Sequence, residues 1–149
     1  MTYAAFRSIG AYIPPKIMTN ADFEKIIDTT DEWITKRTGI KERRISEVDE
    51  ASSDLGARAA QVAIDRAGIA KEEIDLVICA TVTPDYLCMP STACLISAKV
   101  GLPNVMAFDI SAACTGFVYA VSIAKAFIES GMKKNVLIIG AETYTSILD

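Results

Sequence analysis

The sequence contains no histidine, and this absence limits the chemistry that its 149 residues can perform. A zinc site with mixed cysteine and histidine ligands is excluded. The four cysteines, Cys79, Cys88, Cys94 and Cys114, include no C-x-x-C pair. A chain in which 51% of the residues are hydrophobic can build a core without a disulfide scaffold. We therefore expect four reduced thiols, most of them buried, and no bound metal.

Positive charge is also scarce. Fifteen Lys and Arg against nineteen Asp and Glu give a formal net charge of −4, which argues against a nucleic-acid partner. The first residues lack the basic region followed by an apolar region that marks a secretory signal. The longest uncharged run, residues 110–124, is shorter than the roughly 18 apolar residues of a membrane span. The sequence therefore predicts a soluble cytoplasmic protein with neither nucleic acid nor membrane as a partner.

Apolar runs alternate with segments of helical pattern along the chain. Uninterrupted runs such as "LVICA" are typical of strands that are covered on both faces. Strands are predicted within 2–13, 74–82, 105–110 and 135–142, and helices within 19–27, 29–39, 52–68, 91–101 and 114–131. This order predicts an α/β fold with a mostly parallel sheet, right-handed crossovers and flanking helices.

Capping residues mark the two short helices near the N-terminus. Asn20 is the predicted N-cap of the first, Thr30 caps the second, and Gly39 ends the second. The segment "KRTGIKERR" then forms a local positive patch in an acidic chain. Such a patch attracts phosphates or an acidic protein, although solvated surface is the commoner reason for a charge run.

Cys114 stands where the strand "VMAFDI" passes into a helix, among the small residues Ser111, Ala112, Ala113 and Gly116. A helix N-terminus stabilises a thiolate. Small neighbours let a bulky thioester reach the sulfur and free the Cys114 backbone N–H for an oxyanion. The pattern resembles the strand-turn-helix elbow that presents nucleophiles in hydrolases.

From the residues alone, Cys114 is either a nucleophile or a small packing residue, because free cysteine is commonly buried. Cys79 in a strand and Cys94 in a helix are predicted to be packing residues. Cys88 is left open, since it lies in a loop and has no partner pattern.

Five blocks, taken in order, resemble β-ketoacyl-acyl carrier protein synthase III, the initiating condensing enzyme of bacterial type II fatty acid synthesis. They are "SIGAYIPP", "DEWITKRTGIKERR", "CATVTPDYLCMPSTA", "FDISAACTGF" and "LIIGAE". The resemblance implies a thiolase-like layered fold built from two similar halves. Residues 1–149 are expected to be the N-terminal half-domain, with the C-terminal half absent from this chain.

The resemblance also implies an acyltransferase in which Cys114 takes an acyl group from an acyl-CoA such as acetyl-CoA. Malonyl-acyl carrier protein then loses carbon dioxide, and its carbanion attacks the acyl-cysteine to give β-ketoacyl-acyl carrier protein. Thr29, Trp33 and Arg37 match positions that hold coenzyme A, and Met89 matches a wall of the acyl pocket. No cofactor is implied beyond the acyl-CoA substrate. The implied partners are malonyl-acyl carrier protein, the C-terminal half and a second copy in a homodimer.

In this family a histidine, an asparagine and a glycine N–H from the C-terminal half complete the site. We therefore expect that these 149 residues alone do not catalyse condensation. Two alternatives stay open: another thiolase-fold acyl-CoA condensing enzyme, and a non-catalytic half that binds acyl-CoA or a partner half-domain. The block "DEWITKRTGI" favours the synthase III family, whose coenzyme A site it resembles.

Overall fold

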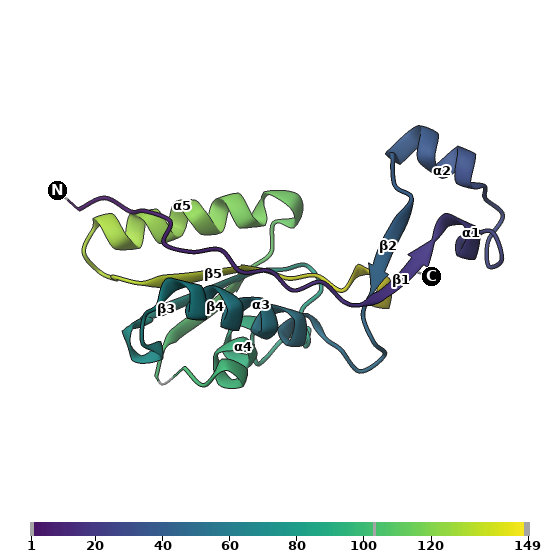
Figure 1. Cartoon of the computed structure of the whole chain (residues 1–149). Helices are drawn as coiled ribbons and strands as arrows, with labels where there is room; N and C mark the ends of the chain where they lie inside the picture. Colours follow the sequence, from purple (N-terminus) through teal and green to yellow (C-terminus); the bar gives the residue numbers. More distant parts are fainter. Residues whose placement is uncertain (1, 103, 148–149) are drawn as a thin grey trace.

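Three parallel strands form the central sheet of the computed structural model, which describes residues 2–102 and 104–147. The strands are β3 (Leu76–Ala80), β4 (Met106–Ile110) and β5 (Val136–Gly140), in the order β4-β3-β5 (Figure 1). All five residues of the central strand β3 are buried, as its unbroken apolar sequence predicts.

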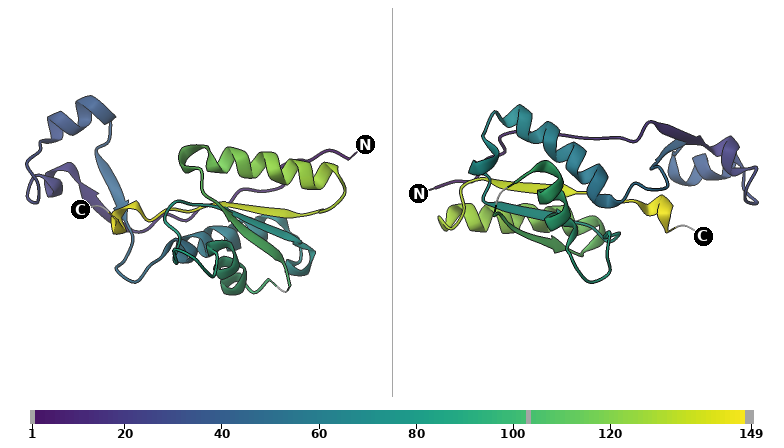
Figure 2. Two further views of the ribbon diagram at one scale, coloured as in Figure 1. Left: turned by 180° about the vertical axis from the view of Figure 1, so that it is seen from behind. Right: turned by 90° about the horizontal axis from the view of Figure 1, so that it is seen from below.

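Helices cover both faces of this sheet. Alternate residues of β3 point to opposite sides, so Val77 and Cys79 pack with α3 (Ser52–Ala67) and α4 (Thr92–Val100). Leu76 and Ile78 pack instead against α5 (Gly116–Glu129). The three layers are visible in Figure 1 and, from behind, in the left view of Figure 2. The predicted α/β architecture is confirmed, and no helix among the described residues has the length and apolar character to cross a bilayer.

Helix α3 begins at Ser52, in agreement with the helix predicted within 52–68. The N-cap is Ala51, whose backbone N–H donates to the Asp54 carboxylate at 3.1 Å. Ser52 and Ser53 lie in the first turn and are fully buried, because each hydroxyl bonds to the loop after β3 instead.

The sheet and the helices α3, α4 and α5 form the main body of the chain, which we call the core. A small lobe projects from it and carries β1 (Lys16–Thr19), α1 (Asn20–Phe23), α2 (Asp31–Thr38) and β2 (Glu42–Ile45). Strands β1 and β2 pair in antiparallel register. Thr30 caps α2 and Gly39 ends it in a left-handed conformation, as the sequence predicts. Strand β2 was not predicted, because its charged sequence "ERRI" indicates exposed surface rather than a buried strand.

The prediction for α1 was wrong in two respects. Its N-cap is Thr19, which forms a capping box with Asp22, and the helix ends at Phe23. Asn20 is the first helical residue and is only 2% exposed, so its side chain serves the interior of the lobe.

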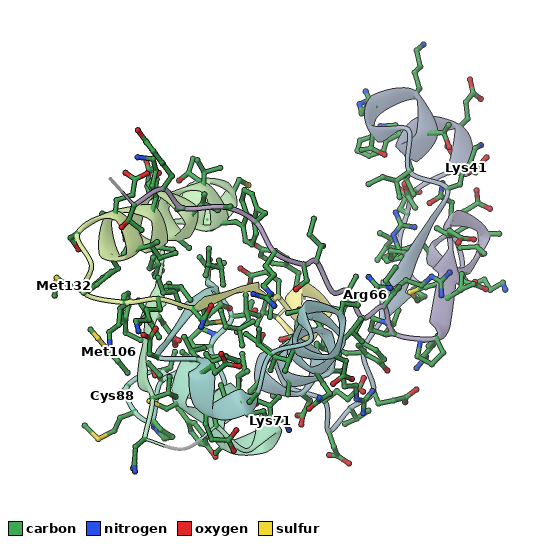
Figure 3. The ribbon with its side chains drawn as sticks, turned by 60° about the vertical axis from the view of Figure 1, so that its left-hand side comes forward. Lys41, Arg66, Lys71, Cys88, Met106 and Met132 are labelled. Atoms are coloured by element: carbon green, nitrogen blue, oxygen red, sulfur yellow. The ribbon has the colours of Figure 1, made fainter. Side chains whose placement is uncertain are left out.

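The strand predicted within residues 2–13 does not form. This segment runs extended along the core. Side chains of the segment and of α3 hold the two together, among them Arg66 of α3, which is labelled in Figure 3. The Arg7 Nε donates to the Ala67 carbonyl at 3.0 Å, and the Arg66 Nη1 donates to the Ile9 carbonyl at 2.8 Å. A cavity of about 750 Å³ lies between the segment and β5, so no ladder of backbone hydrogen bonds joins them.

Gly10 fixes the position of this segment on α3. A Cβ at Gly10 would lie 2.4 Å from the Ala59 carbonyl oxygen and 2.4 Å from the Ala63 nitrogen. Only glycine permits so close an approach to a helix backbone. The extended segment is therefore seated on α3 rather than on the sheet edge.

Candidate active site

Cys114 lies in a short turn between β4 and α5. The 3₁₀ turn η2 (Ala113–Thr115) follows the end of β4 and leads directly into α5 at Gly116. Ala113 has a φ of 45°, which is left-handed and uncommon for a residue with a side chain. Cys114 is exposed, so the structure does not support the interpretation as a buried packing thiol.

The carboxyl end of β3 packs against this turn. A Cβ at Gly116 would lie 3.3 Å from the Ala80 Cβ, which is tighter than ordinary contact. The Thr81 N–H donates to the Ile110 carbonyl at 3.1 Å and ties the loop after β3 to the end of β4. The small residues around Cys114 therefore allow close packing below the thiol while the sulfur stays open above.

Strain at Ala113 gives a testable expectation for this turn. Ala113→Val should lower the free energy of unfolding by about 1–2 kcal/mol and slow Cys114 alkylation, because a β-branched side chain is poorly tolerated at positive φ. Denaturant unfolding and the rate of iodoacetamide labelling measure the two effects. Ala113→Gly is the matched control and should keep the wild-type rate, and equal rates in both variants would contradict the role of this backbone conformation.

Glu142 joins the same end of the sheet from β5. Its carboxylate accepts hydrogen bonds from the backbone N–H groups of Val82 at 2.9 Å and Thr83 at 3.1 Å. It also accepts from the hydroxyls of Thr83 at 2.5 Å and Thr81 at 3.3 Å. Sequence reasoning missed this residue, although an acid at the end of the strand predicted within 135–142 was the available signal. Glu142 therefore clamps the loop that supports the Cys114 turn.

Asp109, five residues before Cys114, has a corresponding role on β4. Its two carboxylate oxygens accept from the backbone N–H groups of Thr92 and Ala93, both at 2.7 Å. These groups are the unpaired donors at the start of α4, where negative charge is stabilised. Asp109 therefore fixes α4 to the sheet at the end that carries Cys114.

The other cysteines are placed differently from the prediction. Only Cys79 is buried, and desolvation raises the pKa of its thiol far above the usual range, with smaller contributions from nearby carboxylates. Cys88 and Cys94 are exposed, so the expectations that most thiols are buried and that Cys94 is a packing residue were wrong. Cys94 lies on α4 at the edge of the sheet, with its Sγ 3.8 Å from the Ala107 carbonyl oxygen.

The residues expected to hold coenzyme A gather on the lobe. Thr29 and Trp33 line a cavity of about 420 Å³ together with Ile27, Asp28 and Thr30. The Arg37 guanidinium carbon lies 4.3 Å from the centroid of the Trp33 ring, a cation–π distance. Trp33 is 52% exposed, so the protein leaves about half of this residue uncovered even though Arg37 lies over its ring.

The carboxylate of Asp31, at the start of α2, binds two neighbouring parts of the lobe. Asp31 accepts from the Asn20 Nδ2 at 2.7 Å and from the Lys41 Nζ at 3.1 Å. Hydrogen bonds lower the pKa of Asp31 below its ordinary value. The bond from Asn20 is the largest cause, and the bond from Lys41 is the second largest. The carboxylate therefore stays charged at neutral pH and holds α2 to the rest of the lobe.

The structure brings Thr29, Trp33 and Arg37 together, but it places Cys114 and Met89 elsewhere. Cys114 lies on the core, and α5 begins at the end of the core nearest the lobe (Figures 1 and 2). Met89 lies in the loop between β3 and α4 and is 77% exposed. The two candidate regions are thus separate parts of one chain.

Comparison with known proteins gives consistent matches. A family model for 3-oxoacyl-[acyl-carrier-protein (ACP)] synthase III matches residues 108–149, which include Cys114. A β-ketoacyl-[acyl-carrier-protein] synthase III of Aliarcobacter butzleri is 83% identical over 149 residues, which are 100% of this chain and 45% of that protein. The corresponding protein of a Sulfurovum species is 72% identical over 147 residues, which are 99% of this chain and 43% of that protein.

A solved structure agrees with these sequence matches. The crystal structure of 3-oxoacyl-[acyl-carrier-protein] synthase III from Aquifex aeolicus superposes with a TM-score of 0.93 at 50% identity. The match covers 100% of this chain and 47% of that one. The chain thus spans less than half the length of the relatives it matches, and the expected thiolase-like fold is confirmed for the part that is present.

Proposed function

The chain belongs to the β-ketoacyl-acyl carrier protein synthase III family, and on this premise we propose that Cys114 accepts the acyl group of an acyl-CoA. The observation that carries the proposal is an exposed thiol on a tight turn at the start of α5. The acyl-cysteine would then be condensed with malonyl-acyl carrier protein to begin a fatty acid chain.

The proposed first step is a thioester exchange. The Cys114 thiolate attacks the carbonyl carbon of the acyl-CoA and forms a tetrahedral intermediate, whose oxyanion the Cys114 backbone N–H stabilises. The bond between this carbon and the coenzyme A sulfur breaks, and coenzyme A leaves as a thiolate that takes up a proton. A thioester replaces a thioester, so the acyl-cysteine keeps the reactivity that the second step needs.

Coenzyme A recognition is proposed for the lobe. The exposed face of Trp33 can stack on adenine, and the forked donors of Arg37 suit a phosphate. Thr29 lines the same cavity. Met89 is proposed for the wall of the acyl pocket, where its flexible side chain would admit a different or larger starter. No cofactor is proposed besides the acyl-CoA substrate.

Condensation requires groups that this chain cannot supply, because it contains no histidine. We propose that the rest of a full-length synthase packs on the core and provides them. The cavity beside β5 supports this, as does α5, where Phe117, Val118 and Tyr119 are 47%, 62% and 51% exposed. Three consecutive large apolar side chains exposed on the first turn of a helix form a patch of the kind that another protein surface normally covers. The homodimer, drawn from the family resemblance, and the cytoplasmic location that the sequence predicts are further parts of this proposal.

Intact mass spectrometry tests the proposed acyl transfer. The chain is incubated with acetyl-CoA, isobutyryl-CoA and longer acyl-CoAs, and the modified residue is located by peptide mapping. We expect one acyl adduct, on Cys114, with at least one starter. A chain that reacts fully with iodoacetamide at Cys114 yet forms no adduct with any acyl-CoA would contradict acyl transfer and leave a binding role.

A further inference from the structure

Asn20 lies inside the lobe, where both ends of its side-chain amide are engaged. The side chain is buried, and its Nδ2 donates to the Asp31 Oδ1 at 2.7 Å and to the Ile40 carbonyl at 2.8 Å. Its Oδ1 accepts from the Arg43 Nη1 at 2.7 Å. Its backbone N–H donates to the Lys41 carbonyl at 3.1 Å. One residue is thus bonded to α2, to the connection after α2 and to β2.

These contacts hold α2 at both of its ends. Asp31 is the first residue of α2, and Ile40 directly follows Gly39, which ends the helix. Apolar packing contributes little, because Ile34 is the only buried residue of α2, all of whose residues the structure describes. The orientation of α2 on the β1-β2 hairpin therefore depends on the polar contacts of Asn20.

Helix α2 carries the residues proposed to recognise the nucleotide. Trp33 borders the 420 Å³ cavity, and Arg37 lies across its ring. A shift of α2 would move both side chains together. Because Trp33 is the only tryptophan in the chain, its fluorescence reports on this helix alone.

We propose that Asn20 is a positioning residue for acyl-CoA recognition: it fixes α2 so that Trp33 and Arg37 are in place before the nucleotide binds. The inference rests on the proposed function of the lobe. An amide is required because one group must donate to the Asp31 carboxylate while the other accepts from the Arg43 guanidinium. A carboxylate at this position can accept from Arg43 but faces Asp31 with a like charge.

The test uses Asn20→Asp in the 149-residue chain. Titration with coenzyme A, followed by Trp33 fluorescence, should show about tenfold weaker binding, the result of losing a buried charge-assisted hydrogen bond. Acetylation of Cys114 by acetyl-CoA at subsaturating concentration should slow to the same extent. Acetylation by S-acetyl-N-acetylcysteamine, which has the same thioester but no nucleotide, should keep the wild-type rate. Asn104→Asp makes the same chemical change at an exposed position of the core and should behave as wild type.

Asn20→Ala adds no charge and should weaken coenzyme A binding in the same direction but less. Equal slowing of Cys114 acetylation by both thioesters would show a general structural effect and overturn the positioning role. Unchanged coenzyme A affinity in Asn20→Asp would overturn that role alone and leave the proposed function standing. Absence of saturable coenzyme A binding in the wild-type chain would overturn both.

Discussion

Cys114→Ala is expected to abolish acyl adduct formation with every acyl-CoA, because the proposed exchange requires a sulfur nucleophile at this turn. The substituted side chain is exposed and small, so the fold should survive with a free energy of unfolding close to that of the wild type. Intact mass after incubation with acetyl-CoA measures the loss, and denaturant unfolding confirms the fold.

The chain supplies its own matched controls for this experiment. Cys88 and Cys94 are also exposed thiols, but neither lies on the turn at the start of α5. Cys88→Ala and Cys94→Ala should therefore keep the full adduct. If the adduct persists in Cys114→Ala and disappears in one of the other two variants, the nucleophile is Cys88 or Cys94 and not Cys114. That result would remove the basis of the proposed mechanism.

Glu142→Ala is expected to lower the free energy of unfolding by about 3 kcal/mol or more, because it removes the acceptor of several donors in the loop after β3. Thr81 and Thr83 are buried, so their groups are left poorly satisfied. For a domain whose total stability is about 5–15 kcal/mol, this is a large fraction. Denaturant unfolding by circular dichroism measures it.

The same change should slow Cys114 labelling by iodoacetamide under native conditions, since Thr81 in this loop is bonded to Ile110 at the root of the turn. Glu142→Gln keeps the shape and one oxygen acceptor and should give an intermediate loss of stability. Glu72→Ala removes an exposed acid of the core and is the control, with an effect below about 0.5 kcal/mol. Equal stabilities for Glu142→Ala and Glu72→Ala would show that the clamp contributes nothing.

The features of this fold differ in how far the local sequence predicts them. The helices α2, α3, α4 and α5 and the strands β3, β4 and β5 follow from local patterns, because caps such as Thr30 and unbroken apolar runs such as "LVICA" act over a few residues. The same local evidence misled at residues 2–13, since a strand also needs a neighbouring strand at hydrogen-bonding distance. The local evidence also misled at Asn20. Asparagine is common as a helix cap, but here its buried side chain forms hydrogen bonds with other residues of the lobe.

The sequence by itself determined the α/β layers, the turn that presents Cys114, and the lack of a histidine for condensation. Only the tertiary structure decided that Cys94 is exposed, that Glu142 supports the turn, and that Asn20 holds α2 through Asp31, Ile40 and Arg43. Local patterns report on neighbours one or two helical turns away, whereas these contacts join residues that are brought together only when separate elements pack.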